Sequence, residues 1–301
     1  MDRLLSMKML VSVIETGSLS AASRRLNVPL ATVSRRIGEL EAHLGAKLLN
    51  RTSRSLDLTD AGRDYLAASR RILDDVAEAE RAAAGEHAAP KGELIVTAPL
   101  VFGRLHLLPV VIEFIKAYPE IDIRLVLNDR VVGLAEDHVD LAVRIGELPA
   151  SSLVAIRVGS IGRIVCASPA YLATRGRPRR PAELASHDCI TFDNLMPAER
   201  WVFPQAGSEI SVAIRSRLSV NTAEAAIDAA VAGIGLTRVL AYQAAEALSR
   251  ETLETVLADF QPAPAPVNLV HSGGRLLPRK LRAFLDLAAP RLRTAIAALP
   301  G

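Results

Sequence analysis

The stretch PLATVSRR places hydroxyl, small and guanidinium side chains close together at the start of a predicted helix. A guanidinium such as that of Arg35 can form two parallel hydrogen bonds with a guanine edge, and small neighbours let the backbone come near. With about 100° per residue and Val33 as the origin, Thr32 and Arg35 point away from Val33, whereas Ser34 and Arg36 lie on the flanks. This face suits insertion into the major groove of DNA. An ordinary surface helix with solvated arginines is the alternative.

Two short helices must hold this face in place. In the first, Leu19, Ala22 and Leu26 share one side, and Ser18 can cap the start. Pro29 suits the first position of the second helix, because its missing N–H is not needed there. The second helix has an apolar stripe at spacings of four and three, formed by Val33, Ile37, Leu40 and Leu44. Together the two helices predict a helix-turn-helix.

A first helix and a short hairpin complete this N-terminal part of the chain, which we call the head. Residues 3–16 carry apolar side chains at helical spacing, which predicts a core of three helices. Residues 47–51 and 56–58 predict two short strands joined by a polar turn, which together form the wing of a winged helix-turn-helix. Arg51 and Arg54 would then reach phosphates or a minor groove. A plain solvated hairpin is the alternative.

A long helix is predicted from the cap residue Thr59 to about Ala84. Its apolar stripe steps by four, three and four, the spacing of a coiled-coil seam, through Ile72, Val76, Ala79 and Ala83. A second copy of the chain is the simplest partner for this stripe, which predicts a homodimer. Residues 85–92 then break the pattern and are typical of a hinge.

Composition and charge narrow the class of protein. The 301 residues are 50% hydrophobic, enough for two or three domains with real cores. Residues 1–63 hold ten Lys and Arg against six Asp and Glu, a net charge of +4, while the remainder holds 26 against 27, a net charge of −1. A polyanionic partner would therefore meet only the head. No apolar run has the length of a membrane span, and the first residues do not form a signal peptide, so we expect a cytoplasmic protein.

The C-terminal part predicts an α/β fold, because strands and helices alternate along it. The predicted strands are 93–98, 121–127, 141–144, 153–158, 164–167, 190–192, 212–220 and 267–270. The predicted helices are 105–118, 131–136, 170–174, 182–185, 223–232, 241–247 and 281–298. Ligands of such folds bind where strands end and helices begin, in the crevice between half-domains.

An enzyme with a DNA-tethering head is a competing hypothesis. The sequence contains no nucleophile elbow, phosphate-binding loop, dinucleotide fingerprint or metal-ligand spacing, so we expect neither a catalytic site nor a cofactor nor a metal. Cys166 and Cys189 are not spaced as a CxxC motif; buried thiols are favoured, with a redox-switch disulfide as the alternative. A DNA-organising protein without a ligand is a third hypothesis.

Taken together, these stretches resemble the LysR-type transcriptional regulators over essentially the whole chain. Matching residues of the head are Val13, Gly17, Ser18, Ala21, Ala22, Leu26, Val33, Ser34, Arg35, Ile37, Leu40, Glu41, Leu44, Gly45, Leu48, Arg51, Arg54, Leu58, Thr59, Ala61 and Gly62. Further matches are Tyr118-Pro119, Asp140-Leu141-Ala142, Arg144-Ile145-Gly146, Ser168 to Leu172 and Gly233-Ile234-Gly235. Many members have Ser-Gln-Pro where this chain has Pro29-Leu30-Ala31, so it resembles the subgroup with the variant helix PLATVSRR.

The resemblance implies a domain order and a set of partners. It implies a winged helix-turn-helix at 1–58, a linker helix and hinge at 59–91, and an effector domain at 92–301 like the type 2 periplasmic binding proteins. Subdomain I would cover about 92–164 and 268–301, and subdomain II about 165–267. The implied partners are double-stranded DNA with dyad symmetry, an anionic or aromatic small molecule, a second copy of the chain in a homodimer or homotetramer, and RNA polymerase. The DNA target would associate the protein with the nucleoid.

The resemblance and the spacing together give the candidate site residues. The candidate DNA contacts are Ser18, Pro29, Leu30, Thr32, Ser34, Arg35, Arg36, Arg51 and Arg54. The candidate effector contacts, carried over by position, are Pro99, Leu100, Val101, Phe102, Asn128, Arg144, Gly146, Asn221, Thr222 and Thr237. Leu30 would meet a thymine methyl group. Arg144 would pair with an effector carboxylate or, alternatively, form a structural ion pair with Asp140 or Glu147.

Overall fold

The computed structural model describes residues 2–51, 56–83, 89–129, 134, 139–192, 200–205, 208–273 and 277–299. The chain divides into two units, Met1–Glu93 and Leu94–Gly301, and each is described by itself. In the described residues, no helix combines the length and the hydropathy that crossing a bilayer requires.

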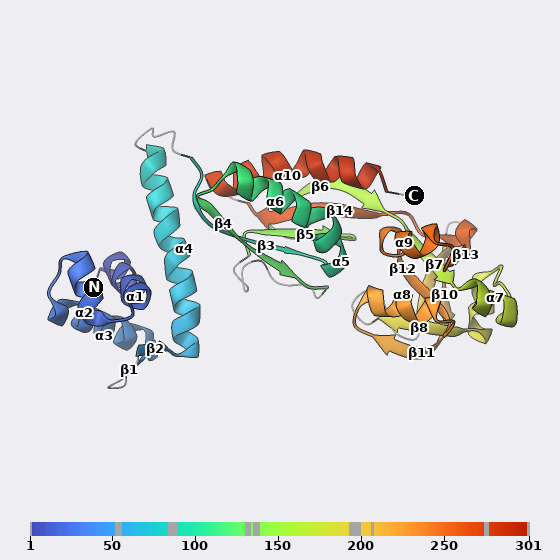
Figure 1. Ribbon diagram of the computed structural model, residues 1–301, viewed down its shortest axis with the longest axis horizontal. Coiled ribbons are helices and arrows are strands. Elements are labelled where there is room, and N and C mark those ends of the chain that lie inside the picture. Colours follow the sequence, from blue (N-terminus) through green and yellow to red (C-terminus); the bar gives the residue numbers. More distant parts are fainter. Residues whose placement is uncertain are drawn as a thin grey trace. The chain divides into compact units, whose positions relative to one another are not determined.

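Unit 1 is a bundle of helices with a small hairpin (Figure 1). Its elements in chain order are α1 (Arg3–Thr16), α2 (Leu19–Leu26), α3 (Leu30–Leu44), β1 (Leu49–Arg51), β2 (Leu56–Leu58) and α4 (Asp60–Ala83). The strands pair antiparallel, with Leu49 opposite Leu58. Leu10, Val13, Ala22, Ile37 and Leu40 are fully buried in one core, which fixes α2 and α3 against α1.

Two local expectations for the helix-turn-helix were wrong in detail. Pro29 is the residue before α3, with extended backbone at φ −57° and ψ 140°, and not the first helical residue. Leu44 is 39% exposed, so the buried stripe of α3 ends one turn earlier, at Leu40 and Glu41. Leu44 is followed at once by Gly45, whose left-handed conformation ends the helix, and this last turn lies beyond the core.

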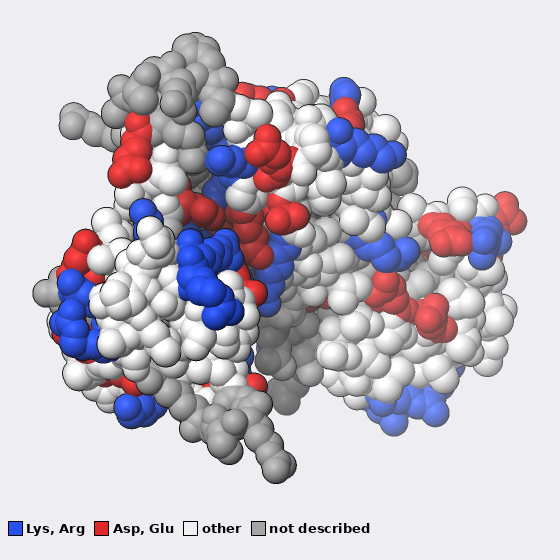
Figure 2. All heavy atoms as spheres, turned by 60° about the vertical axis from the view of Figure 1, so that its left-hand side comes forward, with Lys and Arg blue, Asp and Glu red and all other residues white. Residues whose placement is uncertain are grey.

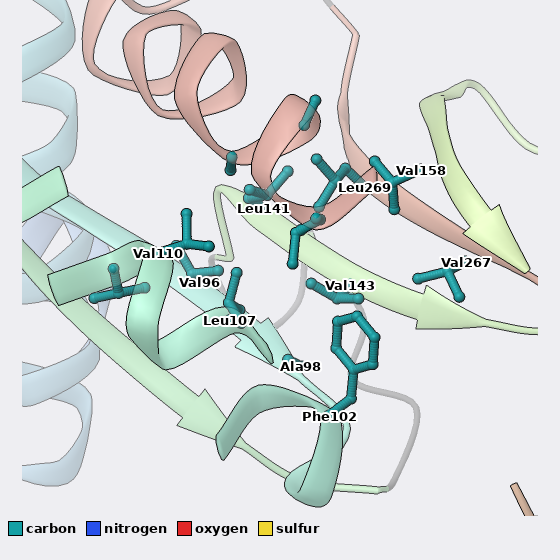
Figure 3. Packing of buried hydrophobic residues seen from close by; sticks show 14 of the residues in the cluster. Val96, Ala98, Phe102, Leu107, Val110, Leu141, Val143, Val158, Val267 and Leu269 are labelled. Carbon is teal, nitrogen blue, oxygen red and sulfur yellow. The ribbon is translucent and has the colours of Figure 1, made fainter. Parts of the chain in front are cut away.

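The first subdomain of unit 2 is built on a five-stranded sheet in the order β4-β3-β5-β14-β6. The strands are β3 (Gly92–Ala98), β4 (Ile121–Leu127), β5 (Leu141–Ile145), β6 (Leu153–Ile161) and β14 (Ala265–Ser272). The helices packed with it are α5 (Leu100–Phe102), the π-helical turn η1 (Gly103–Leu107), α6 (Leu108–Ala117) and α10 (Arg279–Ala297). Val96, Leu141, Val143 and Leu269 converge with Phe102 in its core, as Figure 3 shows.

The second subdomain has its own five-stranded sheet in the order β11-β8-β12-β7-β13. The strands are β7 (Arg163–Ala167), β8 (Asp188–Phe192), β11 (Arg215–Val220), β12 (Leu236–Leu240) and β13 (Glu254–Val256). The helices are α7 (Pro169–Arg175), η2 (Pro181–Ser186), α8 (Ala223–Val231), η3 (Ala241–Gln243), α9 (Ala245–Ser249) and η4 (Ala258–Phe260). Separate apolar clusters cover the two faces of this sheet. The predicted α/β class with two subdomains is confirmed.

Several predicted elements have different bounds. The single strand predicted at 212–220 is two strands in different sheets: β10 (Ser208–Ala213) pairs with β9 (Arg200–Gln205), and β11 joins the second sheet. The helix predicted at 105–118 begins at Leu100 and contains a π-turn, and the one predicted at 241–247 is the pair η3 and α9. The helix predicted at 131–136 falls almost entirely outside the described residues.

The chain passes from one sheet to the other after β6, at Gly162, and returns between β13 and β14. Cys166 and Cys189 are both free and fully buried. They lie in apolar clusters on opposite faces of the second sheet, and burial raises the pKa of each thiol to about 12. The structure therefore favours two inert core thiols over the alternative of a disulfide switch.

Candidate nucleic-acid interface and ligand site

The outer face of α3 exposes the side chains that the sequence singled out. Val33, Ile37 and Leu40 have no exposed surface, whereas Leu30 is 45% exposed on the opposite side. Arg35 points outward with 61% of its side chain exposed, and its Nη1 lies 2.6 Å from Glu39 Oε1. Arg36 is 24% exposed and lies on the flank. Figure 2 shows Lys and Arg side chains at the surface of this unit, with acidic groups between them.

The turn before α3 is fixed by capping. Ser18 Oγ accepts a hydrogen bond from the Ala21 amide at 3.1 Å, so its side chain caps α2. Asn27 adopts the left-handed conformation that ends α2, and Ser23 Oγ donates to the Val28 carbonyl at 2.6 Å. Because groups at both ends of the turn form hydrogen bonds within the chain, the turn holds α3 at a fixed angle to α2.

Sequence reasoning missed the residue that ties the wing to α3. Glu41 is 95% buried, and its Oε1 accepts hydrogen bonds from the amides of Leu48 at 2.9 Å and Leu49 at 3.2 Å. Lys47 Nζ donates to Oε2 at 3.1 Å. Burial alone would raise the pKa of Glu41, but these hydrogen bonds hold it below its ordinary value. Glu41, one of the matching motif residues, is therefore a structural carboxylate that positions β1.

Gly62 explains why α4 can start so close to the wing. A Cβ at this position would overlap the carbonyl oxygen of Leu48, a backbone atom that cannot move alone. We expect Gly62→Ala to lower the free energy of unfolding of unit 1 by about 1–3 kcal/mol, because of overpacking. Gly38→Ala is the matched control: nothing lies within 4 Å of its Cβ, and alanine favours the helix by about 1 kcal/mol. Thermal unfolding in which both variants shift the same way would contradict this assignment.

The wing and the linker helix are described in part. Arg51 lies in β1, and Arg54 lies outside the described residues. Thr59 caps α4, because its Oγ1 accepts from the Gly62 amide at 2.9 Å. On α4, Ile72 is 40% exposed and Val76 is half-buried. At these two positions the predicted apolar stripe is therefore not fully covered by other residues of the chain.

Five of the ten candidate effector residues lie at the same end of the strands of the first sheet. β3 and β5 run parallel, and the Asn128 amide donates to Ala98 at 3.0 Å, so β3, β4 and β5 end together. We call the residues Pro99, Leu100, Asn128, Arg144 and Gly146 at these strand ends the strand-end edge. Here the Leu100 amide donates to Asp129 Oδ1 at 2.9 Å. Arg144 is half-buried, and burial lowers its pKa.

The other candidates take different places. Asn221 and Thr222 follow β11, and Thr222 Oγ1 caps α8 by accepting from the Ala225 amide at 3.2 Å. Val101 and Phe102 point into the core of the first subdomain and are 2% and 0% exposed. Thr237 has no exposed surface, and its hydroxyl donates to the Ile190 carbonyl within the second sheet. Phe102 and Thr237 therefore cannot touch a ligand in this conformation. In the described residues no His, Cys, Asp and Glu cluster could hold a metal.

These features define a class: a winged helix-turn-helix protein whose DNA-binding head is followed by a two-subdomain α/β ligand-binding domain. Residues 4–63 match the family described as bacterial regulatory helix-turn-helix protein, lysR family, and residues 87–293 match the LysR substrate binding domain. The chain belongs to the LysR family, whose members are transcriptional regulators and not enzymes. They bind DNA and small-molecule effectors and form oligomers.

Individual relatives match this chain over nearly its full length. An HTH-type transcriptional regulator of Xanthomonas campestris is 36% identical over 286 residues, covering 94% of this chain and 83% of the relative. Among solved structures, CrgA of Neisseria meningitidis, a LysR-type transcriptional regulator, is 31% identical with a TM-score of 0.60, over 95% of this chain and 98% of CrgA. The Vibrio cholerae virulence activator AphB is 27% identical with a TM-score of 0.60, over 95% and 98%.

Proposed function

We propose that this LysR-family regulator reads a dyad-symmetric operator through the outer face of α3 and responds to a small molecule bound at the strand-end edge. The observation that carries the proposal is the exposed face of α3: Leu30 and Arg35 stand out from a helix whose opposite side is sealed in the core. Thr32 and Ser34, beside them, are half-buried and add hydroxyl groups. We place the chain in the subgroup with the PLATVSRR helix, in which Leu30 meets a thymine methyl group.

Phosphate contacts are assigned to the surrounding residues. Arg36 on the flank, Arg51 and Arg54 on the wing, and the exposed Pro29 and half-buried Ser18 at the turn would follow the DNA backbone. Such contacts fix the register of α3 without reading bases.

The Arg54→Ala variant tests this division of roles. We expect it to weaken binding to operator and random duplexes alike and to reduce the slope of log affinity against log salt by about 1, because one phosphate contact is lost. Fluorescence anisotropy between about 50 and 200 mM salt would measure both quantities. A loss confined to the operator would instead place Arg54 against a base.

Two copies of the head are needed for a dyad, and α4 is the element we assign to pairing them. The exposed Ile72 on α4 supports this assignment, because an apolar seam in water favours a second helix. Homodimers could associate further into homotetramers. RNA polymerase, at an adjacent promoter, is the partner through which bound dimers would act. Binding to operator DNA would keep the protein in the cytoplasm, with the nucleoid.

The effector we propose is anionic or aromatic. The half-buried Arg144 offers a guanidinium at the strand-end edge, and the N-terminus of α8, beside Asn221 and Thr222, favours negative charge. Pro99 and Leu100 add apolar surface. Val101, Phe102 and Thr237 are assigned to shaping the site from behind. A screen of small carboxylates and aromatic acids for a rise in melting temperature would identify the effector class.

A further inference from the structure

A cavity of about 650 Å³ lies between helices of the two subdomains of unit 2. Leu105 and His106 from η1 line one side, and Ile227 and Val231 from α8 line another. Tyr242, from η3, also lines the cavity. Of the ten candidate effector residues only Val101 borders it, so this cavity is separate from the strand-end edge.

Two buried polar atoms at this cavity lack a well-formed hydrogen bond to the protein. Tyr242 is 97% buried, and its Oη forms no hydrogen bond of good distance and angle among the described residues; the Phe102 backbone and the Gln243 side chain are the protein groups close enough to act on it. Nε2 of His106 likewise forms no hydrogen bond among the described residues. A buried polar group without a hydrogen bond costs about 1–3 kcal/mol in the free energy of folding. Two such groups at one cavity therefore suggest that a ligand supplies the missing hydrogen bonds.

The backbone is shaped to bring these groups together. His106 lies on the π-helical turn Gly103–Leu107, a geometry that is rare and frequently found at functional sites. Its ring centroid lies 5.4 Å from that of Tyr242 and 5.1 Å from that of Phe102. The Phe102 and Tyr242 rings meet edge to face at 5.9 Å. Phe102 thus holds both polar rings in place from the core.

Protonation determines what the two rings can bind. Burial lowers the pKa of His106, so its imidazole is neutral at neutral pH. Burial raises the pKa of Tyr242, so its phenol keeps its proton. A ligand hydroxyl can donate to one ring and accept from the other, which matches this pair.

The charges at the rim disfavour an anion. Arg104 pairs with Glu224 at 3.3 Å, and Arg250 pairs with Glu246 at 2.7 Å. Asp228, at the same cavity, leaves an excess of one negative charge. We propose that this cavity is a binding site for an uncharged hydroxylated ring compound of the phenol class, held between Leu105 and Ile227 with its hydroxyl group at His106 and Tyr242. Because the ligand contacts helices of both subdomains, its binding would fix their relative position.

Fluorine NMR titrations of the full-length protein without DNA test this proposal. The probes are 4-fluorophenol, fluorobenzene and 4-fluorobenzoate. We expect 4-fluorophenol to bind at least about fivefold more tightly than fluorobenzene, the worth of one hydrogen bond. We expect 4-fluorobenzoate not to displace it. Equal affinity for 4-fluorophenol and fluorobenzene, or no binding of either, would overturn the proposal.

The Tyr242→Phe variant removes only the hydroxyl group. It should bring the preference for 4-fluorophenol over fluorobenzene below about twofold while circular dichroism shows an unchanged fold. Tyr118→Phe is the matched control, because Tyr118 packs against Phe114 at the end of α6 and does not line the cavity. It should keep the full preference. An undiminished preference in Tyr242→Phe would refute the assignment, whatever the outcome of the DNA-binding experiments.

Discussion

The Arg35→Ala variant is expected to lose about 1–3 kcal/mol of discrimination per half-site, roughly a factor of 5 to 150 in affinity for each half-site. The reason is positional: Arg35 is the exposed guanidinium opposite the buried Val33 and Ile37, at the second turn of α3. Glu39 Oε1, 2.6 Å away, restrains the guanidinium before DNA arrives. Binding to random duplexes should fall much less, because phosphate contacts remain.

The control for charge is Arg70→Ala. Arg70 lies on α4 in the same unit, and its side chain is 48% exposed, near Glu15. Its removal takes one positive charge from the unit without touching α3. Competition assays with operator and scrambled duplexes separate the two effects. Equal losses on both duplexes for Arg35→Ala, or a larger operator loss for Arg70→Ala, would remove Arg35 from base readout.

The Glu41→Ala variant should have the largest effect on the stability of the head. It leaves the buried amides of Leu48 and Leu49 without their acceptor, at a cost of about 2–4 kcal/mol in the free energy of unfolding of unit 1. Glu39→Ala, on the same helix but only half-buried, should cost no more than about 0.5 kcal/mol. Amide hydrogen exchange at Leu48 and Leu49 in the full-length chain would report this directly. Unchanged protection in Glu41→Ala would show that the wing does not depend on this carboxylate.

The same carboxylate sets a pH dependence with a definite sign. The pKa of Glu41 in the folded protein is below its ordinary value of 4.5. Its stabilising contribution is therefore complete above about pH 4.5 and is lost as the pH falls through the lower, folded value. The difference in unfolding free energy between wild type and Glu41→Ala should be constant near neutral pH and shrink in acid.

The DNA-binding head was the most predictable part of the molecule, because its signals are local. Capping by Ser18 and Thr59, the stripe from Val33 to Leu40 and the stop at Gly45 all act within a few residues. The α/β class followed equally from the alternation of short apolar runs. The predicted strand bounds were less accurate where one strand closely follows another. Ile214 separates β10 from β11, which belong to different sheets, and the periodicity of apolar residues does not reveal such a change of sheet.

The features that the sequence did not predict depend on contacts between segments that are far apart in the chain. Asp188 is a buried carboxylate that meets Arg175, Arg215 and Arg217 from other elements. Arg104 and Glu224, 120 residues apart, pair across the subdomains. The burial of Phe102 and Thr237 likewise depends on packing in the completed sheets, so their candidate role in ligand contact could not be judged from the sequence. The π-turn at His106 has no sequence signal of its own.

We propose above that the outer face of α3, presented twice by a dimer, reads DNA. Selection of binding sites from a random duplex library by the full-length protein tests it most directly. We expect enrichment of a dyad-symmetric sequence with two half-sites, and the loss of one base preference in each half-site in the Arg35→Ala variant. Enrichment of a single unrepeated site, or of no sequence at all, would contradict it.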